Sequence, residues 1–309
     1  MSITRFVIIG HVDHGKSTLA GHLLYKVGAF SKHEIEKTFH DAESSKTGRW
    51  KYAYLLDTES EERARGKTHE HSIVPFEYEG VKYELIDTPG HASFVRKTIQ
   101  GIGAFPNVTA VLVISAIENE FNSGFQKGMT KEQCILARAS GVEHIIIAIN
   151  KMDAVNWKDD AITEIQSTMK SFIKSLKFKS VEYIPISAYD GIGIIDILTK
   201  LQSIESTSIF NKLQHSPKGK EKENILVNVL DAKLKVLKCE NIITIGYDCI
   251  VHFKGEEYDA TISNIKDKKF IKTGDIAQIK LTFSSPVPNN IERIILRKND
   301  STIGFATTC

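Results

Sequence analysis

The residues with the clearest chemistry form the stretch Gly10–Thr18, which reads GHVDHGKST. Its spacing is G-x-x-x-x-G-K-[ST], in which the glycines let the backbone curl until successive N–H groups face one anion. Lys16 is then placed to reach the β- and γ-phosphates of a nucleotide, and the Ser17 hydroxyl to bind Mg²⁺. The stretch therefore predicts a phosphate-binding loop, whose contacting residues we expect to be Asp13, His14, Gly15, Lys16, Ser17 and Thr18.

This loop needs a strand before it and a helix after it, and the flanking sequence offers both. The apolar run Phe6–Ile9 precedes the loop and the helix-prone run Leu19–Leu24 follows it. A helix that begins at the loop adds a partial positive charge where the phosphates would lie. A glycine-containing turn without a ligand would not need this strand–loop–helix order. For His11 and His14 a second interpretation stays open, that of loop residues that contact no ligand.

Other polar segments follow predicted strands at their carboxyl ends, where open α/β sheets bind ligands. Asp87 follows the strand Lys82–Ile86 and begins the sequence DTPGH. A carboxylate at a strand end can hold Mg²⁺, usually through water. Gly90 lets its N–H approach a γ-phosphate closely, so we expect this loop to sense that phosphate.

The sequence NKMD at 150–153 indicates which base is bound. It follows the strand Ile145–Ile149, and the Asp153 carboxylate can accept hydrogen bonds from N1 and the 2-amino group of guanine. Adenine lacks that pair of donors and would leave a buried acceptor unpaired. A backbone N–H at Ser187-Ala188 can meet the guanine 6-oxo group. The predicted base-binding residues are Asn150, Lys151, Asp153, Ser187 and Ala188.

Together these segments resemble the translational GTPases of the elongation factor 1-alpha and elongation factor Tu group, over about residues 3–204. Residues 48–57 and 62–66 resemble the eukaryotic and archaeal branch, which includes release-factor and ribosome-rescue GTPases. The resemblance implies that Thr68 binds Mg²⁺ and reports the γ-phosphate, and that His91 positions the attacking water. It also places Asp13 near the phosphates, and it sets Lys67 where the family usually has Ile.

Two histidine assignments have alternatives. His91 can be an ordinary surface-loop histidine, although it stands directly after the sequence DTPG. His69 and His71 can suggest a pair of metal ligands, but no third ligand is evident and alternating exposed residues of a switch strand explain them better.

The resemblance implies two functions. The first is a GTP-hydrolysing translation factor that acts at the ribosome, binds GTP or GDP with Mg²⁺, and is slow without a ribosomal activator. Its expected partners are the ribosome, tRNA or a tRNA-mimicking release or rescue factor, and a nucleotide exchange factor. The second is a GTP-dependent binding module that docks a release- or rescue-factor-like protein without delivering aminoacyl-tRNA. A pseudo-GTPase is disfavoured because every phosphate and guanine element is present.

The pattern along the chain predicts an α/β fold: a P-loop GTPase domain with a mostly parallel sheet over residues 1–204. Short β-branched runs alternate with helical stretches there, as in sheets covered on both faces. Thr130 and Gln133 have the spacing of a capping box, with Gly141 as a C-cap. An amphipathic helix is predicted over 157–176. The predicted strands are Arg5–Ile9, Ser72–Tyr78, Lys82–Ile86, Val108–Ile114, Ile145–Ile149 and Tyr183–Ile186.

The remainder predicts an exposed linker over 205–223 and a small all-β barrel over 224–309. Ser, Lys and Glu dominate the linker, and the evenly spaced runs after it favour a closed barrel or a sandwich. Turns are predicted at 273–275, 286–288 and 298–300. Residues 269–277 and 292–297 resemble the family's third barrel, and we find no equivalent of its middle barrel. The predicted barrel strands are Ile225–Leu230, Ile242–Ile245, Cys249–Phe253, Tyr258–Ser263, Ala277–Phe283 and Arg293–Arg297.

Composition places the chain among ordinary globular proteins. Its 309 residues are 41% hydrophobic and 25% charged, with a net charge of +2 that favours neither nucleic acid nor acidic lipid. The four scattered cysteines predict reduced thiols, with a Cys239–Cys249 redox pair as the lesser alternative. No signal peptide or membrane-spanning run is visible, so we expect a cytoplasmic protein without a membrane partner.

Overall fold

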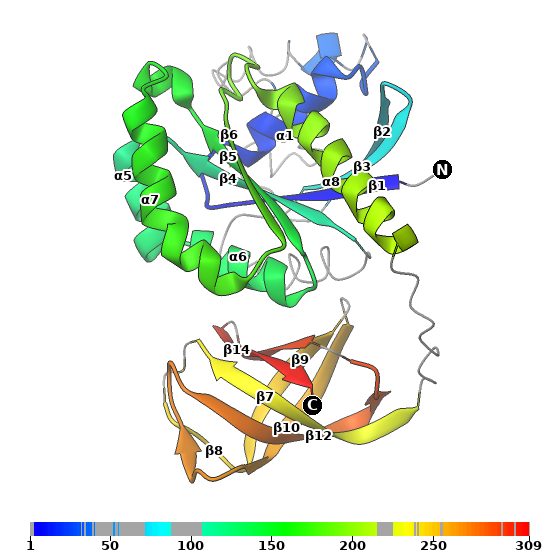
Figure 1. Cartoon of the computed structure of the whole chain (residues 1–309), viewed down its shortest axis with the longest axis vertical. Coiled ribbons are helices and arrows are strands. Elements are labelled where there is room, and N and C mark those ends of the chain that lie inside the picture. The colour runs from blue at the N-terminus through cyan, green and yellow to red at the C-terminus, as the bar shows by residue number, and fades with distance from the viewer. Residues whose placement is uncertain are drawn as a thin grey trace. The chain divides into compact units, whose positions relative to one another are not determined.

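A computed structural model describes residues 3–31, 33, 35–38, 40, 52, 55, 72–87, 107–214, 225–237, 239, 241–253, 256–291, 293–299 and 301–308. The chain forms two compact units, which are described separately below. The first contains a six-stranded mixed sheet with helices, and the second contains a closed barrel (Figure 1). This is the predicted α/β fold followed by a β-barrel.

The sheet of the first unit has the strand order β2-β3-β1-β4-β5-β6. The β2 strand runs antiparallel to β3, and the other neighbours are parallel. Every residue of the central β4 is buried, as expected for a strand covered on both faces. All six predicted strands are confirmed: β1 (Ile3–Ile9), β2 (Ser72–Tyr78), β3 (Val81–Asp87), β4 (Thr109–Ser115), β5 (His144–Asn150) and β6 (Ser180–Pro185).

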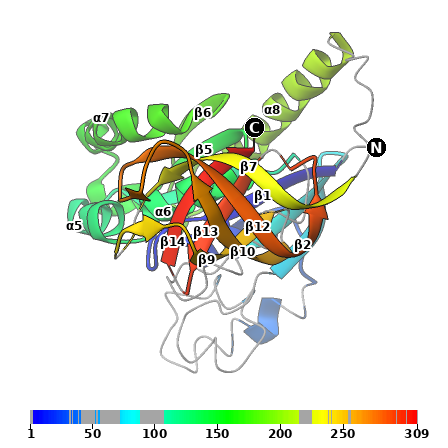
Figure 2. The same ribbon diagram turned by 90° about the horizontal axis from the view of Figure 1, so that it is seen from below.

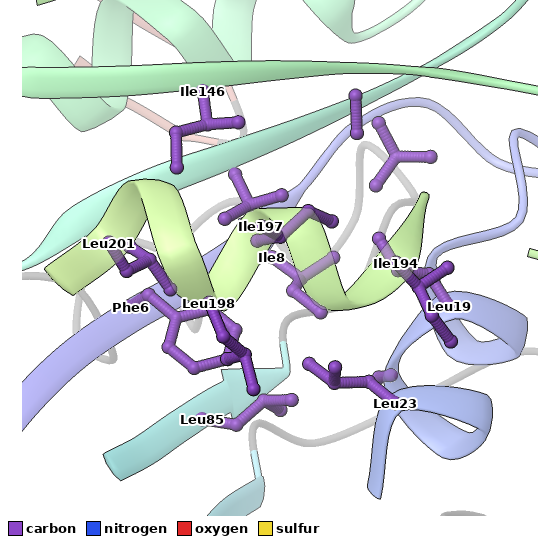
Figure 3. Close-up of a cluster of buried hydrophobic side chains, with 14 of the residues drawn as sticks. Phe6, Ile8, Leu19, Leu23, Leu85, Ile146, Ile194, Ile197, Leu198 and Leu201 are labelled. Carbon is purple, nitrogen blue, oxygen red and sulfur yellow. The ribbon is translucent and has the colours of Figure 1, made fainter. Parts of the chain in front are cut away.

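Helices pack on this sheet in two groups. Figure 1 shows α5, α6 and α7 gathered together, away from α1 and α8. Apolar side chains of α1 and α8 meet those of β1 and β3 in one buried cluster, shown in Figure 3. The helical elements are α1 (Lys16–Lys26), α5 (Glu118–Asn122), the π-helix η4 (Ser123–Lys127), α6 (Thr130–Ala139), the 3₁₀ helix η5 (Met152–Val155), α7 (Asp159–Leu176) and α8 (Ile194–Gln214).

The predicted capping box of α6 is wrong. Thr130 is the first residue of the helix rather than its cap, and its hydroxyl is buried without a hydrogen-bond partner among the described residues. Gln133 does not turn back to cap the helix; its side-chain oxygen accepts a hydrogen bond from the Gly10 N–H. The Gln133 side chain therefore bonds to a residue 123 positions away in the sequence instead of capping its own helix. Gly141 ends this helix with a positive φ of 102°, as predicted.

The helix α8 continues further than its composition suggested. Residues from 205 onwards were expected to be linker, but α8 runs to Gln214. Its inner face places Ile194, Leu198 and Leu201 in the core. This packing stabilises the first part of the helix, which then continues into the polar residues from 205 onwards. The rest of the predicted linker lies outside the described residues.

The second unit is a closed antiparallel barrel of six strands in the order β10-β12-β7-β14-β13-β9. Figure 2 looks onto these strands. Residues alternate between exposed and buried along the first eight positions of β12, so one face of that strand fills the barrel. The strands are β7 (Leu226–Val236), β8 (Ile243–Thr244), β9 (Tyr247–Phe253), β10 (Glu256–Ile265), β11 (Phe270–Ile271), β12 (Ile276–Pro288), β13 (Arg293–Lys298) and β14 (Ser301–Thr308).

Two details of the barrel differ from the sequence prediction. The predicted turn at Pro286–Pro288 belongs to β12, whose pairing with β7 is irregular between Thr282 and Val287. A bulge of this kind accommodates proline, because the ladder is already interrupted there. The strand β14, which closes the barrel between β13 and β7, was not predicted, although its turn near Asn299 was.

The cysteines agree with the prediction of reduced thiols. Cys134, Cys239 and Cys249, the three that the structure describes, are all free, so the Cys239–Cys249 pair is not formed. Burial raises the pKa of Cys249 to about 12, which keeps this thiol protonated and unreactive. Separately, none of the helices in the described ranges has the length and apolar character needed to cross a bilayer.

Candidate functional site

The site lies where the strands of the first sheet end. The β1 strand is flanked by β3 on one side and by β4 on the other, so the connections leave it in opposite directions. Such a switch point opens a crevice at the carboxyl ends of the strands. The loop 10–15 follows β1 there, and register pairs Ile8 with Asp87, the last residue of β3. The predicted phosphate loop and the predicted Mg²⁺ carboxylate therefore come from neighbouring strand ends.

Two glycines of this loop have no substitute. Gly10 has a φ of 143°, and a Cβ there would lie 2.4 Å from the Val113 carbonyl oxygen. Gly15 has a φ of 94°, and a Cβ there would lie 2.3 Å from Nδ2 of Asn150. Side chains avoid both these torsions and these distances. The backbone of this loop therefore runs close to the Val113 carbonyl of β4 and to the side chain of Asn150, which ends β5.

The predicted phosphate-binding side chains stand at the start of α1. Lys16 is its first residue and is buried, and its ammonium donates to the His11 carbonyl oxygen at 2.9 Å. Ser17 and Thr18 follow in the same turn, both half-buried, whereas Asp13 is exposed and has a φ of 63°. The first turn of a helix offers unpaired N–H groups to an anion. The side chains predicted to bind phosphate therefore stand together at a helix start, where Lys16 bonds to its own loop.

His14 points into the protein. Its ring is 1% exposed, with Nδ1 3.3 Å from the Val113 carbonyl oxygen and Nε2 3.2 Å from that of Glu120. A Cβ on Gly124 of η4 would lie 2.4 Å from this ring, so the imidazole fills the space above that glycine. The sequence had offered His14 as a nucleotide contact or as a loop residue without a ligand. Its side chain fastens the loop to the protein, and only its backbone is left for a phosphate.

The burial of His14 has a consequence for stability. Burial, with smaller effects from His11 and Lys16, lowers its pKa to about 4. In the unfolded chain a histidine takes up its proton near pH 6.5, so the unfolded state binds more protons between pH 6.5 and 4. We expect the free energy of unfolding to fall by about 3 kcal/mol as the pH drops through this window, with no further loss from His14 below it.

Chemical denaturation of wild type and His14→Gln between pH 7 and 4 measures this effect. The variant keeps a donor but no titratable ring, so its unfolding free energy should depend less steeply on pH. His33→Gln is the matched control, since His33 is exposed on a helical segment. His144, whose pKa is also lowered by burial, contributes equally to all three proteins. Identical pH profiles for wild type and His14→Gln would contradict the assignment.

Asn150 connects three loops of the site. Its Nδ2 donates to the His14 carbonyl oxygen at 2.9 Å, and its Oδ1 accepts from the Ala188 N–H at 2.8 Å. The side chain is 2% exposed. The phosphate loop, the end of β5 and the loop after β6 are therefore held at fixed distances by one amide.

Asp153 carries the most telling feature of the site. Its Oδ1 is buried and has no hydrogen-bond partner among the described residues. An unpaired buried carboxylate oxygen is costly, and in native proteins it needs an explanation such as a ligand. Asp153 lies in η5, a helix that begins directly after Lys151, and Lys151 has a positive φ of 64°. A hydrogen-bond donor from outside the chain would satisfy this oxygen.

Lys151 forms an ion pair instead of facing solvent. Its ammonium lies 2.6 Å from Oε2 of Glu120 on α5. Burial acts to raise the pKa of Glu120, but hydrogen bonds from Lys151 and Ser115 outweigh it, so the pKa lies below its ordinary value. Glu120 therefore stays ionised and holds the lysine stem in place beside η5.

The predicted backbone donors at Ser187-Ala188 already have partners. The Ser187 N–H donates to the Ile192 carbonyl oxygen at 3.0 Å, and the Ala188 N–H donates to Asn150. The Ser187 hydroxyl donates to Asp190, which closes a tight turn over 187–191. A guanine 6-oxo group would therefore have to share the Ala188 N–H with Asn150. The sequence could not show this, because the competing acceptor is 38 positions away.

Three predicted site residues, Thr68, Gly90 and His91, lie outside the described residues, and so do His69 and His71. For Asp87 the structure gives the backbone position, beside Ile8 and opposite Ser72. Sequence reasoning missed four residues that shape the site: His22, Glu120, Gly124 and Gln133. Each acts through a contact with a residue more than twenty positions away, and no local motif marks such contacts.

Comparisons with known proteins match the first part of the chain to one family. The model of a family described as the elongation factor Tu GTP binding domain matches residues 1–207. Elongation factor 1-alpha of Ignicoccus hospitalis is 40% identical over 196 residues, which are 62% of this chain and 44% of that protein. An elongation factor 1 alpha-like protein of Schizosaccharomyces pombe is 38% identical over 197 residues, 62% of this chain and 33% of that protein. The chain thus matches less than half the length of these relatives.

Solved structures show a similar fold. The Ski7 GTPase-like domain of S. cerevisiae, bound to GDP and inorganic phosphate, superposes with a TM-score of 0.79 at 14% identity, over 99% of this chain and 97% of that one. The bacterial selenocysteine-specific elongation factor EF-Sec gives a TM-score of 0.68 at 17% identity, over 100% of this chain and 58% of that one. At such identities the likeness concerns the fold alone.

Proposed function

The chain belongs to the family of the elongation factor Tu GTP binding domain, and on that premise we propose that it binds and hydrolyses GTP as a translation factor that acts at the ribosome. The observation that carries the proposal is the buried Oδ1 of Asp153, which has no hydrogen-bond partner in the part of the chain that the structure describes. It stands where the sequence predicts the acceptor for N1 and the 2-amino group of guanine. Relatives about 40% identical over this domain are elongation factors 1-alpha, which supports the same reading.

The phosphates of GTP would lie over the loop 10–15 and the first turn of α1. The N–H groups of this turn and the Lys16 ammonium would neutralise the phosphate oxygens, once Lys16 exchanges the His11 carbonyl for a phosphate. The Ski7 domain was solved with GDP and inorganic phosphate and with GTP, which supports a guanine nucleotide as the ligand.

The residues also fit a magnesium ion. A hydroxyl from Ser17 and carboxylate oxygen from Asp87 are hard donors of the kind that Mg²⁺ prefers. Ser17 follows the loop after β1, and Asp87 ends the neighbouring strand β3. When bound, the ion would neutralise charge that develops on the β- and γ-phosphates. We propose Thr68 as a further ligand, Gly90 as the γ-phosphate sensor, and His91 as the residue that orients the attacking water.

The barrel bears on the choice of partner. We propose that residues 1–204 form the GTPase domain and that residues 224–309 are the counterpart of the family's third barrel, joined to it without a middle barrel. A factor of this architecture would engage the ribosome, and through its barrel a release- or rescue-factor-like protein rather than aminoacyl-tRNA. We further propose that it works in the cytoplasm.

Ribosome-stimulated hydrolysis tests the proposed activity. Released phosphate is measured with the purified chain, GTP and Mg²⁺, with and without ribosomes. We expect slow intrinsic hydrolysis that ribosomes accelerate by about 10²-fold or more, and a loss of most of that acceleration in His91→Ala. His33→Ala is the matched control. A rate that ribosomes leave unchanged, together with an unaffected His91→Ala variant, would sink the proposal.

A further inference from the structure

His22 lies in the middle of α1 and is bonded to the base-recognition loop. Its side chain is 4% exposed, and Nδ1 lies 2.7 Å from the Ala188 carbonyl oxygen. Because a carbonyl oxygen only accepts, Nδ1 must carry the hydrogen and donate it. A Cβ on Gly191 would lie 2.6 Å from Cε1 of the ring, so the turn over 187–191 is closed tightly around this imidazole.

One turn further along α1, Lys26 binds the other end of the same loop. Its ammonium donates to the Gly191 carbonyl oxygen at 2.6 Å. Residues four apart lie on one face of a helix, so His22 and Lys26 bind the turn over 187–191 from the same face of α1. The helix that begins with Lys16 at the phosphate loop therefore also holds the loop for the guanine base.

An aromatic side chain from a distant part of the sequence covers His22. The Tyr52 ring stacks on the imidazole with centroids 3.7 Å apart and an angle of 10° between the planes. The Tyr25 ring lies beside both, with its centroid 6.1 Å from that of His22 and 5.5 Å from that of Tyr52. Burial raises the pKa of the Tyr52 phenol, as expected for a ring packed in this way. The stack fixes the ring plane that the hydrogen bond to Ala188 requires.

We propose that His22 is a positioning residue for guanine recognition, and that Tyr52 holds it in place. The proposal rests on the proposed function, since the loop that His22 grips is the one expected at the 6-oxo group. Its Ala188 N–H must keep its direction while it is shared between Asn150 and the base. Without the Tyr52 ring the imidazole would tilt, release the Ala188 carbonyl and speed nucleotide release.

Dissociation of a fluorescent GDP, followed by stopped flow after excess GDP is added, tests this role. We expect His22→Ala to speed dissociation about tenfold, the effect of losing one buried hydrogen bond. His22→Asn should stay within about threefold of wild type, because its amide donor can replace Nδ1–H. Tyr52→Ala should speed dissociation less than His22→Ala, and Tyr52→Phe should match wild type since it keeps the ring.

His144→Ala is the matched control, because this half-buried histidine bonds Ser180 at the far end of β5 and β6. Melting temperatures show whether each variant is folded. If His22→Ala does not fold, Tyr52→Ala takes its place in the test. Unchanged dissociation in both His22→Ala and Tyr52→Ala overturns the proposal. So does an Asn variant as fast as the Ala variant, which would show a merely structural role. A wild type that binds no GDP would instead overturn the proposed function on which the inference rests.

Discussion

Asp153→Asn is expected to weaken GTP binding by roughly 10³-fold and to create binding of xanthosine triphosphate. The amide that replaces the carboxylate presents an N–H group toward the 2-amino group of guanine, and two donors then face each other. Xanthine has a 2-oxo group at that position, which accepts from the new amide, while its N1–H still donates to the amide oxygen. Equilibrium titration with fluorescent forms of GTP and xanthosine triphosphate measures both affinities.

The control for this substitution is Asp159→Asn, which removes a carboxylate at the exposed start of α7. It should leave both affinities at the wild-type values. If Asp153→Asn kept its preference for guanine, the buried Oδ1 would have another explanation and the base assignment would be wrong.

Asn150→Ala is expected to weaken GTP binding by about 10²-fold or more and to lower the free energy of unfolding by about 2–5 kcal/mol. The substitution leaves the His14 carbonyl and the Ala188 N–H buried without their partner. The phosphate loop and the base loop then lose their common anchor. Binding titration and chemical denaturation measure the two effects on the same protein.

Two further variants sharpen this test. Asn150→Asp keeps an acceptor for the Ala188 N–H but turns a buried carboxylate oxygen toward the His14 carbonyl, so two acceptors face each other and the variant should be at least as impaired as Asn150→Ala. Asn119→Ala, at an exposed position of α5, should change neither quantity by a measurable amount. Wild-type affinity in Asn150→Ala would show that the three loops are fixed by other contacts.

Much of the first unit could be predicted because its signals are local. The run Thr109–Ser115 is apolar and β-branched over its whole length, and it is the fully buried β4. Lys16, Asn150 and Asp153 could be predicted as site residues because their spacing from a strand end suggests their chemistry. The structure brings the loops that carry them to one edge of the sheet.

What the sequence did not show depends on distant contacts. His14 was predicted as a nucleotide contact, or as a loop residue that contacts no ligand, but its ring lies against the carbonyl oxygens of Val113 and Glu120. The strand β14 was missed because Ser301–Thr308 is a polar, glycine-containing run, which forms a strand by closing the barrel between β13 and β7. Local sequence patterns do not indicate which strand a segment will pair with, or which distant carbonyl will accept a hydrogen bond from a polar side chain.

The most direct test of guanine specificity is a competition titration of the wild-type chain. The same titration gives the reference affinities for Asp153→Asn. A fluorescent GDP is bound in the presence of Mg²⁺ and displaced by unlabelled GTP, GDP or ATP. We expect GTP and GDP to displace the probe at comparable, low concentrations and ATP to require at least about 10³-fold more. Displacement by ATP at the same concentration as GTP, or a probe that never binds, would contradict this expectation.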